Sequence, residues 1–127
     1  MAKILLVEDN EMNADMLSRR LRKVGHDVHL ATDGEQAVAM TQALLPELVL
    51  MDISLPLIDG CEATRRIRAN PATAGTRILA LTAHALPFER VRALEAGCDD
   101  YDTKPVDFKR LRGKIAAILG SVRPPGT

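Results

Sequence analysis

Three short apolar runs, each followed by a polar residue, constrain the fold of this sequence more than any other feature. The runs extend from Ile4 to Val7, from Leu48 to Met51 and from Ile78 to Leu81, and they contain almost no polar alternation. Strands that are buried on both faces of a parallel sheet have this pattern, because helices cover both sides of such a sheet. The sequence therefore indicates a buried parallel sheet.

Segments with helical spacing lie between the apolar runs. In the first segment, apolar residues recur at the period of one helix face: Met12, Met16, Leu17, Leu21 and Val24. Gly25 follows at a place where a left-handed cap is easily made. A strand over Val28 to Ala31 then leads to a helix that Asp33 caps, and this helix runs to Leu45 and stops at Pro46.

The same alternation continues to the end of the chain. Further helices are expected to begin near Asp59, Pro87 and Val106. Gly97 ends the fourth helix, and a weak strand around Tyr101 precedes the last helix, which extends to about Leu119. Strand and helix therefore alternate five times, and right-handed crossovers then require an open parallel sheet with helices on both faces. The predicted fold class is doubly wound α/β.

Chain length and charge limit what the protein can do. A chain of 127 residues is about one domain. We expect that domain over residues 1–120 and a flexible C-terminal tail, rich in Pro and Gly, over residues 121–127. Lys and Arg together number 17, and Asp and Glu also number 17, so no net field attracts nucleic acid or an anionic membrane surface. Neither is an expected partner.

Three features of the sequence favour the cytoplasm. Cys61 and Cys98 are isolated from each other, and no secretory segment precedes Lys3. The apolar runs are also far shorter than the roughly 20 residues that a membrane span needs. We therefore expect a cytoplasmic protein without a disulfide.

Charged and hydroxyl side chains stand at the carboxyl ends of the expected strands, where open α/β sheets have their functional crevice. The set comprises Glu8 and Asp9 after the first strand, Asp52 after the third, Thr82 after the fourth and Lys104 after the fifth. Carboxylates in one place repel each other unless protons or cations compensate their charge. Hard oxygen ligands suit Mg²⁺, and Lys104 adds a charge that can contact a phosphoryl oxygen. A strand-end Asp in such a site can form an aspartyl phosphate.

Each of these residues also has a purely structural interpretation. Asp9 can cap the first helix, Thr82 can be one more β-branched strand residue, and Lys104 can be a solvated surface lysine. Asp52 is different, because the residues that follow it, Ile53 to Pro56, do not look like the start of a helix that it could cap. The joint pattern carries the functional interpretation.

The pattern resembles the receiver domain of response regulators, of the chemotaxis-regulator type. The matching stretches are spread over nearly the whole chain: Ile4–Asn10, Leu50–Ile53, Leu55–Pro56 with Asp59–Gly60, Ala80–Ala83, and Tyr101 with Lys104–Pro105. The resemblance implies a flavodoxin-like doubly wound (βα)5 fold, with a five-stranded parallel sheet of order 2-1-3-4-5. It also implies a phosphoacceptor switch of a two-component phosphorelay, which is not an enzyme.

The resemblance assigns the acceptor and the metal ligands. It implies that Asp52 is the phosphoacceptor and that the cofactor is Mg²⁺. Glu8 and Asp9 resemble the acidic pair that holds the metal together with Asp52. Ser54 resembles the position whose backbone carbonyl completes the metal site.

The resemblance also assigns a switch. Thr82 resembles the hydroxyl residue that turns toward the phosphoryl group, and Tyr101 resembles the aromatic residue that moves inward behind it. Lys104 resembles the lysine that pairs with the phosphoryl group. The peptide bond between Lys104 and Pro105 is expected to be cis.

Partners follow from the same resemblance. A histidine kinase or a histidine phosphotransfer protein is expected to donate or receive phosphate, with the kinase docking on the first helix. A downstream protein or a second receiver is expected to meet the fourth helix, fifth strand and fifth helix, so that the chain is a monomer or a weak homodimer. The residues expected on that surface are Phe88, Arg92, Glu95, Tyr101, Lys109 and Arg112. The stretches Glu8–Asn10 with Asn13, and Glu62–Arg68, look closest to single-domain phosphorelay proteins and hybrid-kinase receivers.

Two positions need separate interpretation. Asp102 stands where the family usually has an apolar residue, and we expect an exposed, shortened edge strand that charge protects from unwanted pairing. His84 follows Thr82 on a loop that should overlook the phosphoryl group. It is either a solvated loop histidine or a group that tunes water access and phosphoryl lifetime.

Three alternatives compete with the stand-alone switch. The chain can be a receiver fragment of a hybrid histidine kinase. A phosphohydrolase of the haloacid dehalogenase type also phosphorylates a strand-end Asp, but that chemistry needs a second Asp where this chain has Ser54. A pseudo-receiver that only makes protein contacts should have lost Asp52, Lys104 or the acidic pair.

Overall fold

A computed structural model describes residues 2–53, 55, 59–83 and 87–120 of the chain. Five strands form one parallel sheet in the order β2-β1-β3-β4-β5, as the sequence predicts. The strands are β1 (Lys3–Val7), β2 (Asp27–Ala31), β3 (Leu48–Asp52), β4 (Arg77–Thr82) and β5 (Asp100–Thr103). The helices are α1 (Glu11–Lys23), α2 (Gly34–Leu44), α3 (Gly60–Ala69), α4 (Pro87–Ala96) and α5 (Phe108–Gly120).

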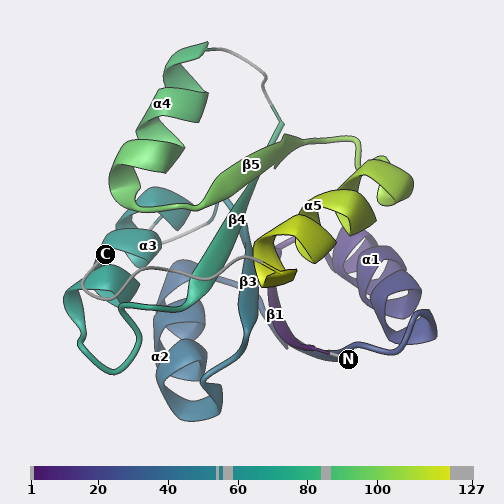
Figure 1. The fold of residues 1–127 in the computed structure, drawn as a ribbon, viewed down its shortest axis with the longest axis horizontal. Coiled ribbons are helices and arrows are strands. Elements are labelled where there is room, and N and C mark those ends of the chain that lie inside the picture. The colour runs from purple at the N-terminus through teal and green to yellow at the C-terminus, as the bar shows by residue number, and fades with distance from the viewer. Residues whose placement is uncertain (1, 54, 56–58, 84–86, 121–127) are drawn as a thin grey trace.

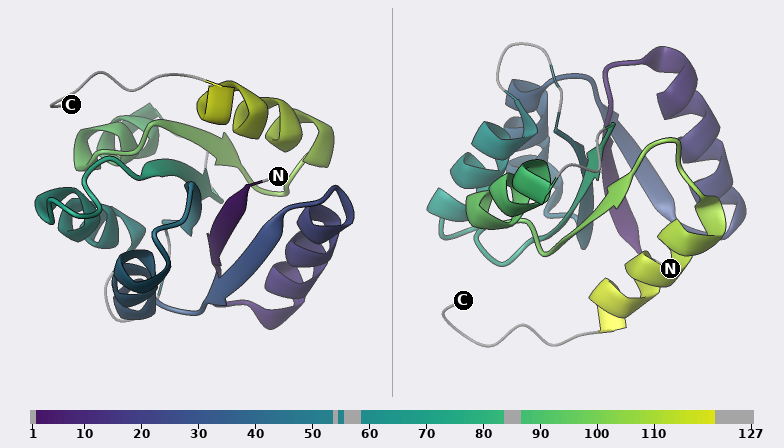
Figure 2. Two further views of the ribbon diagram at one scale, coloured as in Figure 1. Left: turned by 60° about the horizontal axis from the view of Figure 1, so that its bottom comes forward. Right: turned by 90° about the horizontal axis from the view of Figure 1, so that it is seen from above.

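Helices cover both faces of the sheet. Figure 1 places α1 and α5 on one side and α2, α3 and α4 on the other, and the turned views of Figure 2 show the sheet between these two groups. Each face has its own apolar cluster: alternate strand residues such as Leu5 and Val7 pack toward α2, α3 and α4, whereas Ile4 and Leu6 pack toward α1 and α5. This double burial explains the continuous apolar runs.

The three continuous apolar runs form the strands at the centre of the sheet. Residues 4–7, 48–51 and 78–81 are all at most 1% exposed. Among the described residues, no helix has the length and apolar composition that crossing a membrane requires.

Helix ends follow the expected local signals. Asp33 caps α2 and Asp59 caps α3, each accepting a hydrogen bond from a backbone N–H in the first turn. Gly25 and Gly97 adopt positive φ angles of 100° and 116° after α1 and α4. The helix α2 ends at Leu44, and Leu45 supplies the left-handed cap with φ 48°.

The expectation of an exposed Asp102 is wrong. The strand β5 is short and lies at the sheet edge, as expected, but Asp102 is only 3% exposed. Its Oδ1 accepts hydrogen bonds from Arg110 Nε, at 2.8 Å, and from the Thr103 backbone N–H, also at 2.8 Å. Arg110 belongs to the first turn of α5, so its guanidinium brings a positive charge over the buried carboxylate and makes the charge tolerable there.

Candidate functional site

An acidic cluster lies at the carboxyl end of the sheet. The strands β1 and β3 are neighbours, so Glu8 and Asp9, which follow β1, come close to Asp52, the last residue of β3. One carboxylate oxygen from each of the three residues lies within 4.8 Å of the others. Glu8 and Asp52 are 5% and 4% exposed, whereas Asp9 is exposed. Three converging carboxylates of this kind suit a hard divalent cation that keeps some of its water ligands.

Lys104 reaches into this cluster from the loop after β5. Its Nζ donates to Glu8 Oε1 at 2.7 Å and to Asp52 Oδ2 at 2.9 Å. The backbone N–H of Lys104 donates to the Thr82 carbonyl oxygen at 2.8 Å, and the Lys104–Pro105 bond is cis, as expected. The parallel sheet thus brings Lys104 into contact with Glu8 and Asp52, which lie 96 and 52 residues away from it in the sequence.

The Lys104 ammonium stays charged in this position. Partial burial lowers the pKa of Lys104, but its hydrogen bonds to Glu8 and Asp52 and their negative charges outweigh this effect, so the pKa lies above its usual value. One ammonium against three carboxylates still leaves an excess of negative charge. A divalent cation would balance that excess, so the residues present fit the metal that the sequence predicts.

Asp9 does not cap the first helix. The cap of α1 is Asn10, whose side chain accepts the hydrogen bond from the Asn13 N–H at 3.0 Å. The Asn10 N–H in turn donates to Glu8 Oε2 at 3.3 Å. This contact orients the Glu8 carboxylate, whose other oxygen, Oε1, accepts the hydrogen bond from Lys104. The structural interpretation of Asp9 is therefore wrong, and its carboxylate is available to the cluster.

The start of α3 packs against the backbone of Asp52 and Ile53 through Gly60, a role that the sequence analysis did not assign to this residue. The Gly60 N–H donates to the Ile53 carbonyl oxygen at 2.9 Å. A Cβ atom on Gly60 would lie 2.4 Å from the Asp52 carbonyl oxygen, which no side chain allows. The signal that could have identified it is the Asp-Gly pair at the start of α3, where Asp59 caps and Gly60 packs.

Thr82 and Tyr101 lie on the same side of neighbouring strands. Tyr101 pairs with Ala80, and Ala80 and Thr82 point to the same face of β4 because strand side chains alternate. Thr82 is buried, and its Oγ1 donates to Glu89 Oε2 at 2.8 Å. The half-buried ring of Tyr101 contacts two cations, with the Arg90 guanidinium 5.3 Å and the Lys114 Nζ 5.0 Å from its centroid.

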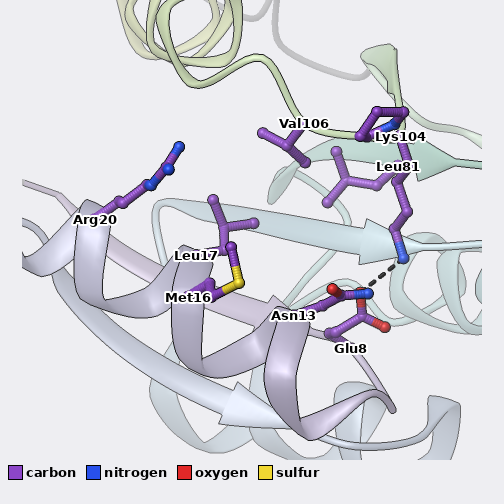
Figure 3. A pocket seen from close by; sticks show the side chains of 9 residues that line it. Glu8, Asn13, Met16, Leu17, Arg20, Leu81, Lys104 and Val106 are labelled. Atoms are coloured by element: carbon purple, nitrogen blue, oxygen red, sulfur yellow. Dashed lines mark hydrogen bonds and ion pairs between the residues drawn. The ribbon is translucent and has the colours of Figure 1, made fainter.

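A groove of about 490 Å³ opens beside the acidic cluster, between α1 and the loop after β5. Figure 3 shows Glu8 and Lys104 at one end of it, with Met16 and Leu17 of α1 and Val106 along its length. Asn13, Arg20, Leu81 and Pro105 complete the lining. Met16 is half exposed, so an apolar surface continues from the groove onto α1.

The expected output surface is accessible. Phe88, Arg92 and Glu95 lie exposed on α4, and Lys109 and Arg112 lie exposed on α5, with the half-buried Tyr101 between them on β5. Arg92 additionally pairs with Asp59, the cap of α3.

Three expectations fall on parts of the chain that the structure does not describe. The Ser54 carbonyl as a metal ligand, the loop position of His84 and the flexible tail over residues 121–127 all lie outside the described residues. Both cysteines, Cys61 and Cys98, are free and buried, as expected without a disulfide. Burial raises the pKa of Cys98 to about 11, which disfavours the nucleophilic thiolate form.

Comparison with known proteins gives a consistent result. The family model of the response regulator receiver domain matches residues 4–116. The chain is 34% identical over 119 residues to the DNA-binding dual master transcriptional regulator RpaA of Synechocystis, covering 94% of this chain and 49% of RpaA. It is 44% identical over 113 residues to hybrid signal transduction histidine kinase G of Dictyostelium discoideum, covering 87% of this chain and 3% of the kinase. The chain thus spans about half, or much less, of these relatives.

Solved structures of receiver domains and response regulators resemble this chain in both fold and sequence. The receiver domain of sensor histidine kinase PA1611 from Pseudomonas aeruginosa superposes with a TM-score of 0.88 at 41% identity, covering 94% of this chain and 98% of that one. That crystal structure has a magnesium ion coordinated in its active-site cleft. A putative response regulator from Chloroflexus aurantiacus superposes with a TM-score of 0.90 at 34% identity, again covering 94% and 98%.

Proposed function

Because this chain belongs to the response-regulator receiver family, a family of phosphoacceptor switches in two-component signalling, we propose that Asp52 is the residue that accepts its phosphoryl group. The observation that carries the proposal is the position of Asp52, buried at the end of β3 beside Glu8 and Asp9, with Lys104 Nζ 2.9 Å from its Oδ2. The same cluster suits Mg²⁺, with Glu8, Asp9 and Asp52 as side-chain ligands. By the resemblance to the family alone, the backbone carbonyl of Ser54 is a further ligand of this proposed site.

The chemistry of the site follows from its charges. With a phosphohistidine as donor, one Asp52 carboxylate oxygen forms the new P–O bond while the P–N bond breaks, and the electron pair stays on the donor nitrogen. Lys104, kept protonated by its carboxylate neighbours, places positive charge beside the accepting carboxylate. When bound, Mg²⁺ supplies charge neutralisation for the transferring group. Thr82 and Tyr101 then report the phosphoryl group to the outer surface.

Partners are assigned to two surfaces. The groove along α1 adjoins Glu8 and Lys104, so a histidine kinase or histidine phosphotransfer domain that docks there presents its histidine to Asp52. The exposed residues of α4, β5 and α5 are left for a downstream protein or a second copy, with the chain a monomer or weak homodimer. The balanced charge argues against nucleic acid as a partner. The free cysteines support the cytoplasm as the compartment.

The proposal limits the chemistry that the chain does alone. Ser54 stands where a phosphohydrolase of the haloacid dehalogenase type needs its second Asp, so turnover is restricted to self-phosphorylation from small donors and autodephosphorylation. Whether the domain works alone or within a hybrid kinase, the acceptor chemistry at Asp52 is the same.

Labelling with acetyl phosphate and Mg²⁺ tests the acceptor. The wild-type chain should gain one phosphoryl group in intact-mass spectrometry, and Asp52→Asn should gain none, because a carboxamide is not a nucleophile. Asp27→Asn, which changes an exposed carboxylate at the start of β2, is the matched control and should label like the wild type. Labelling of Asp52→Asn at the wild-type level, with or without metal, would overturn the proposal.

A further inference from the structure

The hydroxyl of Thr82 is engaged by a carboxylate on the neighbouring helix. Thr82 ends β4 and is 4% exposed, and its Oγ1 lies 2.8 Å from Oε2 of Glu89, in the first turn of α4. The strand β4 pairs with β3, which ends at Asp52, so this hydrogen bond forms on the strand next to the acceptor. Glu89 is half-buried, and the contact is therefore partly shielded from water.

This hydrogen bond competes with any contact between Thr82 and a phosphoryl group. A hydroxyl has one proton to donate, and an ionised carboxylate only accepts, so Thr82 is the donor to Glu89. Phosphoryl oxygens also only accept. Thr82 cannot direct its proton to both groups, and it has to leave Glu89 before it can donate to a phosphoryl group on Asp52.

A second polar contact ties the same helix to the start of α3. Arg92 follows Glu89 by one helical turn, and its guanidinium pairs with Asp59, the cap of α3. Asp59 precedes Gly60, which packs against the backbone of Asp52. Partial burial raises the pKa of Asp59, but the Glu62 N–H and the Arg92 guanidinium outweigh it and hold that pKa below its usual range.

We propose that Glu89 is a positioning residue that holds the Thr82 hydroxyl in its resting orientation, so that phosphorylation has to break the Thr82–Glu89 hydrogen bond. This inference rests on the proposed function, since it assumes that Asp52 accepts the phosphoryl group. Breaking the bond frees the first turn of α4, while the Arg92–Asp59 pair still tethers the next turn. Phe88, exposed in that first turn, is thereby coupled to the state of Asp52.

Beryllofluoride with Mg²⁺, as a phosphoryl mimic, tests this role through its apparent affinity, followed by amide NMR. Glu89→Ala should bind the mimic about 3- to 10-fold more tightly than the wild type, because Thr82 no longer has to leave a charged acceptor. Glu89→Gln keeps a weaker, neutral acceptor and should fall between the two. Glu35→Ala, which removes an exposed charge from the first turn of α2, is the control and should bind like the wild type.

Repeating the measurement in a Thr82→Ala background separates the positioning of the Thr82 hydroxyl by Glu89 from the effect of the Glu89 charge. Removing Glu89 also removes a negative charge near an anionic ligand, and this effect persists without the Thr82 hydroxyl, whereas the gain from freeing the hydroxyl disappears. The gain from Glu89→Ala should therefore vanish or fall sharply in Thr82→Ala. In the unliganded protein, Glu89→Ala should also move the Thr82 methyl resonance toward its position in the mimic-bound wild type.

The outcomes are distinct. If the wild type fails to bind beryllofluoride at Asp52, the proposed function itself is wrong. If the wild type binds it, but Glu89→Ala gains nothing or gains equally in both backgrounds, Glu89 does not position Thr82. If Glu89→Gln and Glu89→Ala have equal affinities for beryllofluoride in both backgrounds, only the charge of Glu89 matters and the positioning role is wrong. If Glu89→Ala does not fold, the same comparison is made with Glu89→Gln.

Discussion

At the scale of single residues, the position of Asp52 depends on a residue without a side chain. A Cβ on Gly60 would meet the Asp52 carbonyl oxygen at 2.4 Å and Ile53 Cα at 2.8 Å. Both are backbone atoms, so no side chain can move aside to relieve the overlap. Gly60 thus lets the start of α3 pack directly against the backbone of Asp52. Lys104, from the loop after β5, contacts the Asp52 carboxylate.

Replacing Gly60 should impair phosphorylation without touching a charged group. Gly60→Ala should slow labelling of Asp52 by acetyl phosphate about tenfold or more and lower the free energy of unfolding by about 1–3 kcal/mol, because the backbone at Asp52 has to shift. Gly113→Ala is the control, since a Cβ there meets nothing within 4 Å, and it should label normally. Normal labelling and unchanged denaturant unfolding of Gly60→Ala would contradict this role of Gly60.

At the scale of elements, β5 and α5 are joined by a buried charge. Asp102 is buried with its Oδ1 paired to Arg110, and within the part of the chain that the structure describes its Oδ2 has no hydrogen-bond partner. Arg110 also contacts Thr103 Oγ1 at 3.4 Å. The pair holds the first turn of α5 against the strand that leads to Lys104. Such a carboxylate is costly by itself and tolerable only while its cation is present.

The effect of each substitution on stability should therefore depend on whether its partner residue is still present. Arg110→Ala should destabilise the domain by about 1–2 kcal/mol, a discounted value because the arginine is half exposed, since it leaves Asp102 buried without its cation. Asp102→Val should cost little or stabilise, and should restore most of the loss in the Arg110→Ala background. Urea unfolding of the two single variants and the double variant measures the coupling, and strictly additive losses would contradict it.

At the scale of the whole molecule, negatively charged side chains lie together at the carboxyl end of the sheet. Glu8, Asp9 and Asp52 come from neighbouring parallel strands, whose carboxyl ends necessarily meet on the same side. The apolar clusters on the two faces of the sheet stabilise the fold and offset the repulsion between the carboxylates at this end of the sheet. A cation bound there should stabilise the folded state as a whole.

Magnesium should raise the unfolding temperature. A ligand that binds only the folded state at 100 times its Kd adds about 2.7 kcal/mol, and chelation with EDTA should reverse the rise. Asp9→Asn should show a much smaller rise, because it removes one of the three carboxylates while the other two remain. Calorimetry with and without metal measures both effects, and an equal rise in Asp9→Asn would exclude that residue as a ligand.

The layered architecture follows from local patterns in the amino-acid sequence. Continuous apolar runs indicate burial on both faces, and helical spacing between them requires crossover helices, so the sheet and its five helices could be predicted. The strand-end positions of Glu8, Asp52 and Lys104 then predicted their convergence, because parallel strands end on one side. These inferences need only local periodicity and chain direction.

The pairing of polar groups, in contrast, depends on how the elements pack against each other. Asp102 was expected to be exposed, yet Arg110 of the next helix covers it, and the cap of α1 is Asn10 rather than Asp9. The Thr82–Glu89 hydrogen bond likewise depends on where α4 packs against β4. A short polar side chain has several partners within reach of its own segment, and the choice between them depends on packing distances between elements, which no local pattern in the sequence specifies.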